Sequence, residues 1–177
     1  MAHKDGSVED LVGCRPRPHN LAKDITVQIL RALVYLDSES LIHRDVKPAN
    51  ILYSEREDGR YQFYLADFGL SNWVDNSISC CGTPLFRAPE IWKHEEQSSK
   101  VDVWSLFVTF LWVANTRGFR TTSEHLGAGR HLWLKVQSVG YLAGISKAVS
   151  ALRDMGAENP EQRPSAREAL NLLEEVE

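Results

Sequence analysis

Five polar side chains stand close together in one short stretch of the sequence, between aliphatic residues that favour burial. The stretch is LIHRDVKPANIL, residues 41–52. Its polar residues are His43, Arg44, Asp45, Lys47 and Asn50. A buried charge without a partner is costly. These groups therefore either pair with one another in a surface ion-pair network or are directed at a ligand.

A second acidic group, Asp67, follows two strand-like runs, ILY and YQFYLA, which are separated by SEREDGR with its Asp-Gly turn signal. We expect a β-hairpin that returns Asp67 to the neighbourhood of Asp45, Lys47 and Asn50. Carboxylate and amide oxygens suit Mg²⁺, which leaves other positions to water and phosphates. A lysine can neutralise a transferring phosphoryl group, and an aspartate can accept a hydroxyl proton. The set therefore predicts phosphoryl transfer from a nucleotide.

Three motifs, in this order, resemble the signature set of the eukaryotic protein kinases: HRDVKPAN at residues 43–50, DFG at residues 67–69 and APE at residues 88–90. By that resemblance Asp45 is the catalytic base, and Lys47 contacts the γ-phosphate of ATP. Asn50 and Asp67 would bind ATP through the Mg²⁺ that they hold. The lysine two residues after Asp45 is similar to the serine/threonine kinase pattern.

The resemblance also assigns a substrate-binding segment to CGTPLFRAPE. Thr83 would bridge Asp45 and Lys47, while Leu85 and Phe86 would line the pocket for the residue that follows the phosphate acceptor.

Regulation is implied by Arg44, the arginine directly before the catalytic aspartate. In the family this arginine accompanies a phosphate in the activation segment, which lies in the long loop 70–89. Ser79, four residues before Thr83, is the first candidate for this phosphosite, and Ser77 is the second.

Three further matches imply structural roles without chemistry of their own. Asp102 in VDVWSL would brace the backbone near His43 and Arg44. Arg163 in EQRPSA would pair with Glu90, the glutamate of the APE motif.

The apolar periodicity of the chain predicts the elements that must position these residues. A helix is expected from about 20 to 37, with Asn20 as its N-cap, because its apolar residues recur on one wide face. The stretch 101–114 is apolar nearly all round and predicts a buried central helix. A final helix should begin after Ser165, with Glu168 completing a capping box.

The expected fold is mainly α-helical with a small β-hairpin, and the resemblance makes it protein-kinase-like. Residues 1–19 read as a mobile lead-in and residues 20–177 as the kinase domain. Only 42 residues precede His43, and they contain no GxGxxG, no VAIK-like strand and no helix with a plausible partner glutamate. We therefore expect a truncated domain, the large helical C-terminal lobe, with the N-terminal lobe missing and little activity alone.

Composition narrows the class of protein. A formal net charge of −4 argues against a dedicated nucleic-acid binder, which would usually be basic. The three cysteines are an odd number without CxxC spacing, which is typical of reduced thiols. There is no apolar signal-peptide core, and the longest apolar stretch, 106–114, is too short to span a bilayer. We expect a soluble cytoplasmic or nuclear protein without nucleic-acid or membrane contacts.

The sequence thus predicts a protein serine/threonine kinase that uses ATP and Mg²⁺ and acts on a protein substrate. A partner would cover the face left by the missing lobe. One alternative is a non-catalytic, kinase-like binding or scaffold module, against which the intact Asp45, Asn50 and Asp67 argue. Another is a Mg²⁺-dependent phosphotransferase of small molecules, which is disfavoured because the segment around Thr83 resembles one that receives a polypeptide.

Overall fold

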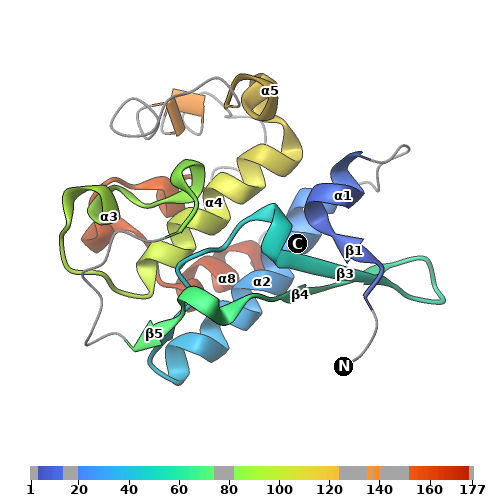
Figure 1. Cartoon of the computed structure of the whole chain (residues 1–177), viewed down its shortest axis with the longest axis horizontal. Helices are drawn as coiled ribbons and strands as arrows, with labels where there is room; N and C mark the ends of the chain where they lie inside the picture. Colours follow the sequence, from blue (N-terminus) through green and yellow to red (C-terminus); the bar gives the residue numbers. More distant parts are fainter. Residues whose placement is uncertain are drawn as a thin grey trace.

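The structure is a computed structural model of the 177-residue chain. It describes residues 4–13, 20–73, 82–123, 135–136, 138–139 and 152–175. Helices form most of the molecule, and a small antiparallel sheet lies at one end (Figure 1). The mainly α-helical architecture with a small β-hairpin, as predicted, is confirmed.

The helices lie around one long, buried element. Their bounds are α1 (Val8–Gly13), α2 (Leu21–Ser38), α3 (Pro89–Lys93), α4 (Lys100–Ala114), α5 (Phe119–Ser123) and α8 (Ala166–Glu174). Short 3-10 helices connect them: η1 (Pro48–Asn50), η2 (Phe68–Leu70), η4 (Pro84–Phe86), η5 (Thr116–Gly118), η6 (Asp154–Gly156) and η7 (Pro160–Gln162).

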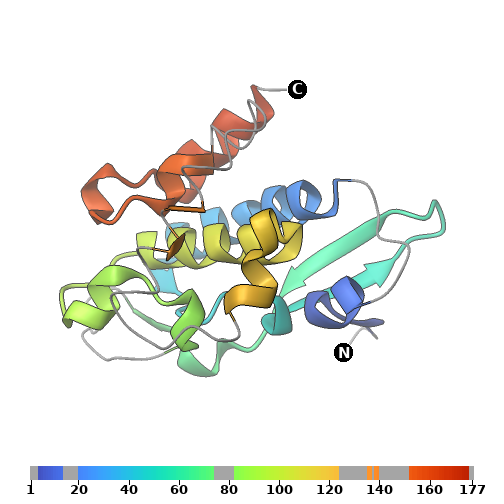
Figure 2. The same ribbon diagram turned by 90° about the horizontal axis from the view of Figure 1, so that it is seen from above.

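The centre of the core is α4, in which 12 of the 15 residues are buried. Because this helix is apolar on every side, it must be covered all round. Seen from above, α2 and α4 form a middle layer, with α8 on one side and the loops that carry the polar motifs on the other (Figure 2). The helix predicted for 101–114 is confirmed within one residue.

Among the residues that the structure describes, five strands build two small antiparallel sheets: β1 (Gly6–Ser7), β2 (Leu41–Ile42), β3 (Ile51–Glu55), β4 (Tyr61–Leu65) and β5 (Asn72–Trp73). The expected hairpin is β3–β4, whose register runs from Ile51 opposite Leu65 to Glu55 opposite Tyr61. Strand β1 adds a third strand to it. The pairing of β2 with β5 brings the chain after the Asp-Phe-Gly triplet beside the chain before His43.

The amino-terminal segment differs from the mobile lead-in expected for residues 1–19. Ser7 caps α1 through a reciprocal pair of bonds: its N–H donates to Asp10 Oδ2 at 2.9 Å, and its Oγ accepts from the Asp10 N–H at 3.3 Å. Val8, Leu11 and Val12 are buried on one face of the helix. Apolar burial and the strand pairing of β1 hold residues 6–13 in place.

The predicted N-terminal cap is present in α8 but not in α2. Helix α8 begins with the predicted capping box, in which Ser165 and Glu168 bond each other's backbone N–H. Asn20 occupies the N-cap position of α2, but its backbone is left-handed (φ 63°) and its side chain makes no capping bond.

In the described part of the chain, no helix combines the length and apolarity needed to cross a membrane.

Candidate active site

The loop between β2 and η1 is bound by a buried carboxylate. Asp102, in the first turn of α4, accepts the His43 N–H at 2.7 Å and the Arg44 N–H at 2.8 Å. Burial raises the pKa of Asp102, and these bonds oppose that rise. Arg44 has a left-handed backbone (φ 70°), which costs energy in a residue with a side chain. The two bonds that Asp102 accepts stabilise this turn.

The His43 ring connects the loop to the Asp-Phe-Gly segment. Its Nε2 lies 3.0 Å from the Ala66 carbonyl oxygen, and its Nδ1 lies 3.3 Å from the Asp45 backbone N–H. An N–H can only donate, so Nδ1 accepts and Nε2 carries the proton that Ala66 accepts. The ring also meets Phe68 edge-on, with centroids 4.9 Å apart.

Asp45 lies between Lys47, Asn50 and Thr83, and each of its two carboxylate oxygens accepts two hydrogen bonds. Oδ1 accepts from the Thr83 N–H at 2.9 Å and the Thr83 hydroxyl at 2.8 Å. Oδ2 accepts from Lys47 Nζ at 2.7 Å and Asn50 Nδ2 at 2.9 Å. Lys47 also donates to Thr83 Oγ1 at 2.7 Å, so Thr83 bridges Asp45 and Lys47.

Charge and hydrogen bonding set the ionisation of Asp45. Burial by itself raises the pKa of this carboxyl, but the bonds from Lys47 and Thr83 outweigh it and hold the pKa below its usual value. Asp45 is therefore an oriented carboxylate at neutral pH and can accept a proton.

Asn50 ties the cluster to the segment that ends at Asp67. Its Nδ2 also donates to the Asp45 carbonyl at 2.9 Å, and its own carbonyl accepts the Ala66 N–H at 2.9 Å. Asp67 has a left-handed backbone (φ 63°), is exposed, and accepts the Gly69 N–H at 3.3 Å. Because Nδ2 of Asn50 is occupied, its amide oxygen is the atom available to a cation.

The donor set of Asn50 and Asp67, one amide oxygen and one carboxylate, fits Mg²⁺ better than a transition metal. Mg²⁺ typically takes one or two carboxylates and completes its shell with water and phosphate oxygens. Within the described residues, no group of three or more His, Cys, Asp or Glu could hold a metal by protein ligands alone. Such a site would need phosphate or water ligands as well.

Gly82 explains how Thr83 reaches Asp45. Its φ is +84°, and a Cβ at this position would lie 2.4 Å from the Arg44 carbonyl oxygen. Only glycine allows this approach without displacing the backbone at residue 82 or at Arg44. Sequence reasoning missed this residue, although a glycine directly before a site threonine was visible in the sequence.

The residues after Thr83 divide between the core and its edge. Phe86 is buried, and its carbonyl accepts the Ser105 hydroxyl at 2.8 Å. Leu85 is half-buried against the core. The predicted role of Leu85 and Phe86 in a substrate pocket stays a prediction. Ser77 and Ser79, the proposed phosphosites, lie outside the described residues.

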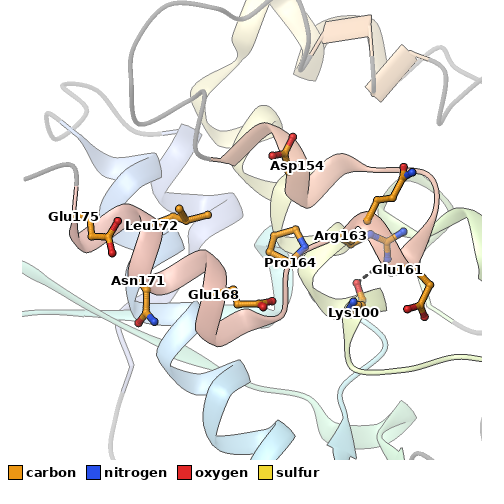
Figure 3. Close-up of a pocket in the computed structure, with 10 residues that line it drawn as sticks. Lys100, Asp154, Glu161, Arg163, Pro164, Glu168, Asn171, Leu172 and Glu175 are labelled. Carbon is orange, nitrogen blue, oxygen red and sulfur yellow. Dashed lines mark hydrogen bonds between the residues drawn. The ribbon is translucent and has the colours of Figure 1, made fainter.

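Arg163 and Glu90 meet in the core, where the side chains are 0% and 1% exposed. Arg163 also donates to the Lys100 carbonyl at 2.7 Å (Figure 3) and to the Ala157 carbonyl at 3.0 Å. The carbon of the guanidinium lies 5.2 Å from the centre of the Trp104 ring. This network connects α3, which follows the site segment, to α4 and the C-terminal region.

Comparisons with known proteins show which chains this one is similar to. The family described as the protein kinase domain matches residues 3–172. The calcium/calmodulin-dependent protein kinase cmkB of Emericella nidulans is 32% identical over 158 residues, covering 84% of this chain and 39% of that protein. The probable serine/threonine-protein kinase drkB of Dictyostelium discoideum is 30% identical over 167 residues, covering 89% of this chain and 23% of that protein.

The serine/threonine-protein kinase chk-2 of Caenorhabditis elegans is 43% identical over 98 residues, covering 51% of this chain and 20% of that protein. The chain thus spans well under half the length of each of these curated relatives.

Proposed function

The chain belongs to the protein kinase domain family, and on that premise we propose that it transfers the γ-phosphoryl group of ATP to a serine or threonine hydroxyl of a protein. The observation that carries the proposal is the carboxylate of Asp45, fixed by four hydrogen bonds and kept ionised at neutral pH. An oriented carboxylate beside a lysine is what proton abstraction during phosphoryl transfer needs.

Asp45 would act as the base. A carboxylate has about four lone-pair positions, and those of Asp45 are all used. A substrate hydroxyl must therefore replace one existing donor before Asp45 can take its proton. The proton would pass from the hydroxyl oxygen to Asp45 as that oxygen forms its bond to the γ-phosphorus, while the bond from this phosphorus to the bridging oxygen breaks and ADP leaves.

Lys47 is the donor best suited to give way. Its ammonium has three donor positions and bonds both Asp45 and Thr83. A γ-phosphate oxygen would attract the same ammonium group, so Lys47 can exchange its bond to Asp45 for one to phosphate. Thr83 and Asn50 would then keep the carboxylate in place while its freed lone pair receives the hydroxyl.

Asn50 and Asp67 would hold Mg²⁺, which the protein kinase family generally uses together with ATP. When bound, the metal would neutralise negative charge on the phosphates. The chain's own part is to present the Asn50 amide oxygen and the exposed Asp67 carboxylate, both fixed by backbone bonds around Ala66 and Gly69.

We propose a serine/threonine acceptor because Lys47 follows Asp45 by two residues, and because the relatives named above include serine/threonine-protein kinases. The substrate would be a protein, and Thr83, Leu85 and Phe86 would contact the segment around its acceptor residue. The three cysteines without CxxC spacing favour the cytoplasm or nucleus as its location.

A non-catalytic binding role is the second candidate, and an exposed apolar surface beside the site favours it. Phe68 is 49% exposed and Leu70 is 42% exposed, next to the exposed Asp67. Large apolar side chains gathered at one place often mark a surface that another element covers. We propose that an amino-terminal lobe or a partner covers this face, and that the 177 residues alone have little activity.

Phosphate transfer to a mixture of serine, threonine and tyrosine peptides distinguishes the candidates. The chain would be assayed alone and joined to the amino-terminal lobe of a protein kinase, with labelled ATP and Mg²⁺. Label on serine or threonine supports the kinase. Label absent under both conditions, with partner binding intact, would favour the scaffold.

A further inference from the structure

An open groove lies on the outside of α2, between this helix and the β3–β4 hairpin, with a cavity volume of about 520 Å³. Both elements are adjacent in Figure 1 and Figure 2. Four basic side chains line the groove: Lys23, Arg31, Arg56 and Arg60. Asp24 is the one acidic residue among the residues that line it.

This concentration of positive charge is a local feature. The chain as a whole has a formal net charge of −4. A second groove, beside α8, is lined by four acidic residues, Asp154, Glu161, Glu168 and Glu175, and by two basic ones, Lys100 and Arg163, all labelled in Figure 3. The basic groove therefore differs in sign from the whole chain.

The walls of the basic groove are fixed by hydrogen bonds across its floor. Gln28 of α2 donates to the Tyr61 carbonyl at 3.2 Å and accepts from the Phe63 N–H at 3.0 Å and Gln62 Nε2 at 2.8 Å. The half-buried Val27 and Tyr61 pack against the core and give the groove an apolar component. A preformed groove loses little conformational entropy on binding.

The hairpin turn places two of the arginines opposite each other. The Arg56 N–H donates to the Arg60 carbonyl at 2.8 Å, and Gly59 closes the turn with φ +74°. Within the described part of the chain, the Arg56 guanidinium makes no hydrogen bond or ion pair. Arg56 can therefore pair with a ligand without breaking an existing bond.

The other arginines have partners that a ligand can replace. Arg60 pairs with Asp58 at 2.7 Å, and Arg31 pairs with Glu174 at 3.0 Å, all on exposed side chains. Exposed ion pairs of this kind contribute little to stability. A carboxylate delivered by another molecule can take the place of Asp58 or Glu174 at small cost.

We propose that this groove docks an acidic peptide segment of a partner protein. Carboxylates of the segment would pair with Arg31, Arg56 and Arg60, while an apolar side chain would lie on Val27 and Tyr61. The apolar floor and the spread of cations along the groove favour an extended peptide over a single small anion. The docking concerns binding alone and does not depend on the proposed catalysis.

Fluorescence anisotropy with a labelled peptide of glutamate and leucine tests the proposal on the whole 177-residue chain. The variant R56E/R60E reverses two charges in the groove, and R117E/R167E reverses two exposed charges elsewhere, so both change the net charge equally. We expect the groove variant to weaken binding at least about tenfold, because like charges face each other, and the control to stay within about twofold. Raising the salt from about 0.1 to 1 M should also weaken binding, since the Debye length falls from about 10 to 3 Å.

Several results would overturn the proposal. The first is that the wild-type chain does not bind the peptide at millimolar concentration. The second is that both double variants weaken binding equally. The third is that a peptide with glutamine in place of glutamate binds as tightly as the acidic peptide. A single-stranded oligonucleotide that binds more tightly than the peptide would assign the groove to nucleic acid instead. If R56E/R60E does not fold, Arg56→Gln replaces it, and unchanged peptide binding by that folded variant would contradict the docking.

Discussion

The guanidinium of Arg163 lies against the carboxylate of Glu90 with two parallel hydrogen bonds, Nη1 to Oε1 at 2.7 Å and Nη2 to Oε2 at 3.0 Å. The two residues are 73 positions apart in the sequence. Backbone carbonyls of Lys100 and Ala157 accept further bonds from Arg163, so the buried charges are both paired and solvated by the protein.

Replacing Arg163 with alanine should destabilise the chain strongly, because Glu90 would be left buried without its partner. Loss of one member of such a pair costs about 3–5 kcal/mol. At roughly 2–4 °C per kcal/mol for a domain of this size, the melting temperature should fall on the order of 10 °C. Arg167→Ala, on the exposed face of α8, is the control and should change it little. Equal effects in thermal denaturation would contradict a structural role for the pair.

Gly82→Ala should be more damaging than Gly59→Ala, although both glycines have positive φ. Each substitution carries the backbone cost of about 1–2 kcal/mol. At Gly59 a Cβ meets nothing within 4 Å, whereas at Gly82 it meets the Arg44 carbonyl oxygen at 2.4 Å. The additional loss at Gly82 should be visible in denaturant unfolding, and Thr83 should move away from Asp45. A loss no larger than that of Gly59→Ala would show that the approach at Arg44 is not tight.

Lys47→Met should raise the pKa of Asp45. Burial raises this pKa, and the bond from Lys47 is the largest of the effects that lower it. The titration midpoint of the Asp45 carboxyl, followed by ¹³C NMR, should be higher in Lys47→Met than in the parent chain. Lys93→Met, which removes an exposed pair with Glu158, should leave the titration midpoint of Asp45 unchanged. An unchanged Asp45 midpoint in Lys47→Met would mean that Thr83 and Asn50 suffice to hold the charge.

The lowered pKa of Asp45 also makes the free energy of unfolding depend on pH. The folded pKa of Asp45 lies below its value in the unfolded chain, about 3.9. Asp45 therefore stabilises the fold at pH above that value, and this contribution is lost as the pH falls through the folded pKa. Lys47→Met should reduce this contribution.

Ser79→Ala should lower activity in a form of the kinase that is active, while Ser77→Ala should change it little. A phosphate on Ser79 would add charge and acceptor oxygens that Arg44 can bind, and such bonds order loops. Kinase assays on phosphorylated and dephosphorylated protein measure this directly. A larger effect of Ser77→Ala would reverse the assignment.

Much of the helical framework could be predicted because its signals are local. The apolar face of α2, the all-round apolarity of α4 and the Ser165–Glu168 capping box depend on residues close in sequence. The hairpin was predictable for the same reason, since Asp58-Gly59 forms its turn between two strand-like runs.

Features that join distant segments were harder to predict. Strand β1 is only two residues long and depends on β3, more than 40 positions away. The sequence contains the pattern of α1, with Ser7 and Asp10 as capping residues and Val8, Leu11 and Val12 on one face. This pattern is too short to distinguish a helix from a loop. The role of Gly82 depends on the position of the Arg44 carbonyl, which no local pattern reveals.

The central claim is that Asp45 is the base of a serine/threonine kinase, and its most direct test is phosphate transfer by Asp45→Asn. The chain, joined to the amino-terminal lobe of a protein kinase, would be assayed with labelled Mg·ATP and a serine peptide. Asp58→Asn, which changes an exposed carboxylate on the hairpin, is the control and should keep the parent rate. We predict that Asp45→Asn lowers the turnover number at least about a hundredfold, as loss of a general base typically does. A turnover number within about threefold of the parent would contradict the account.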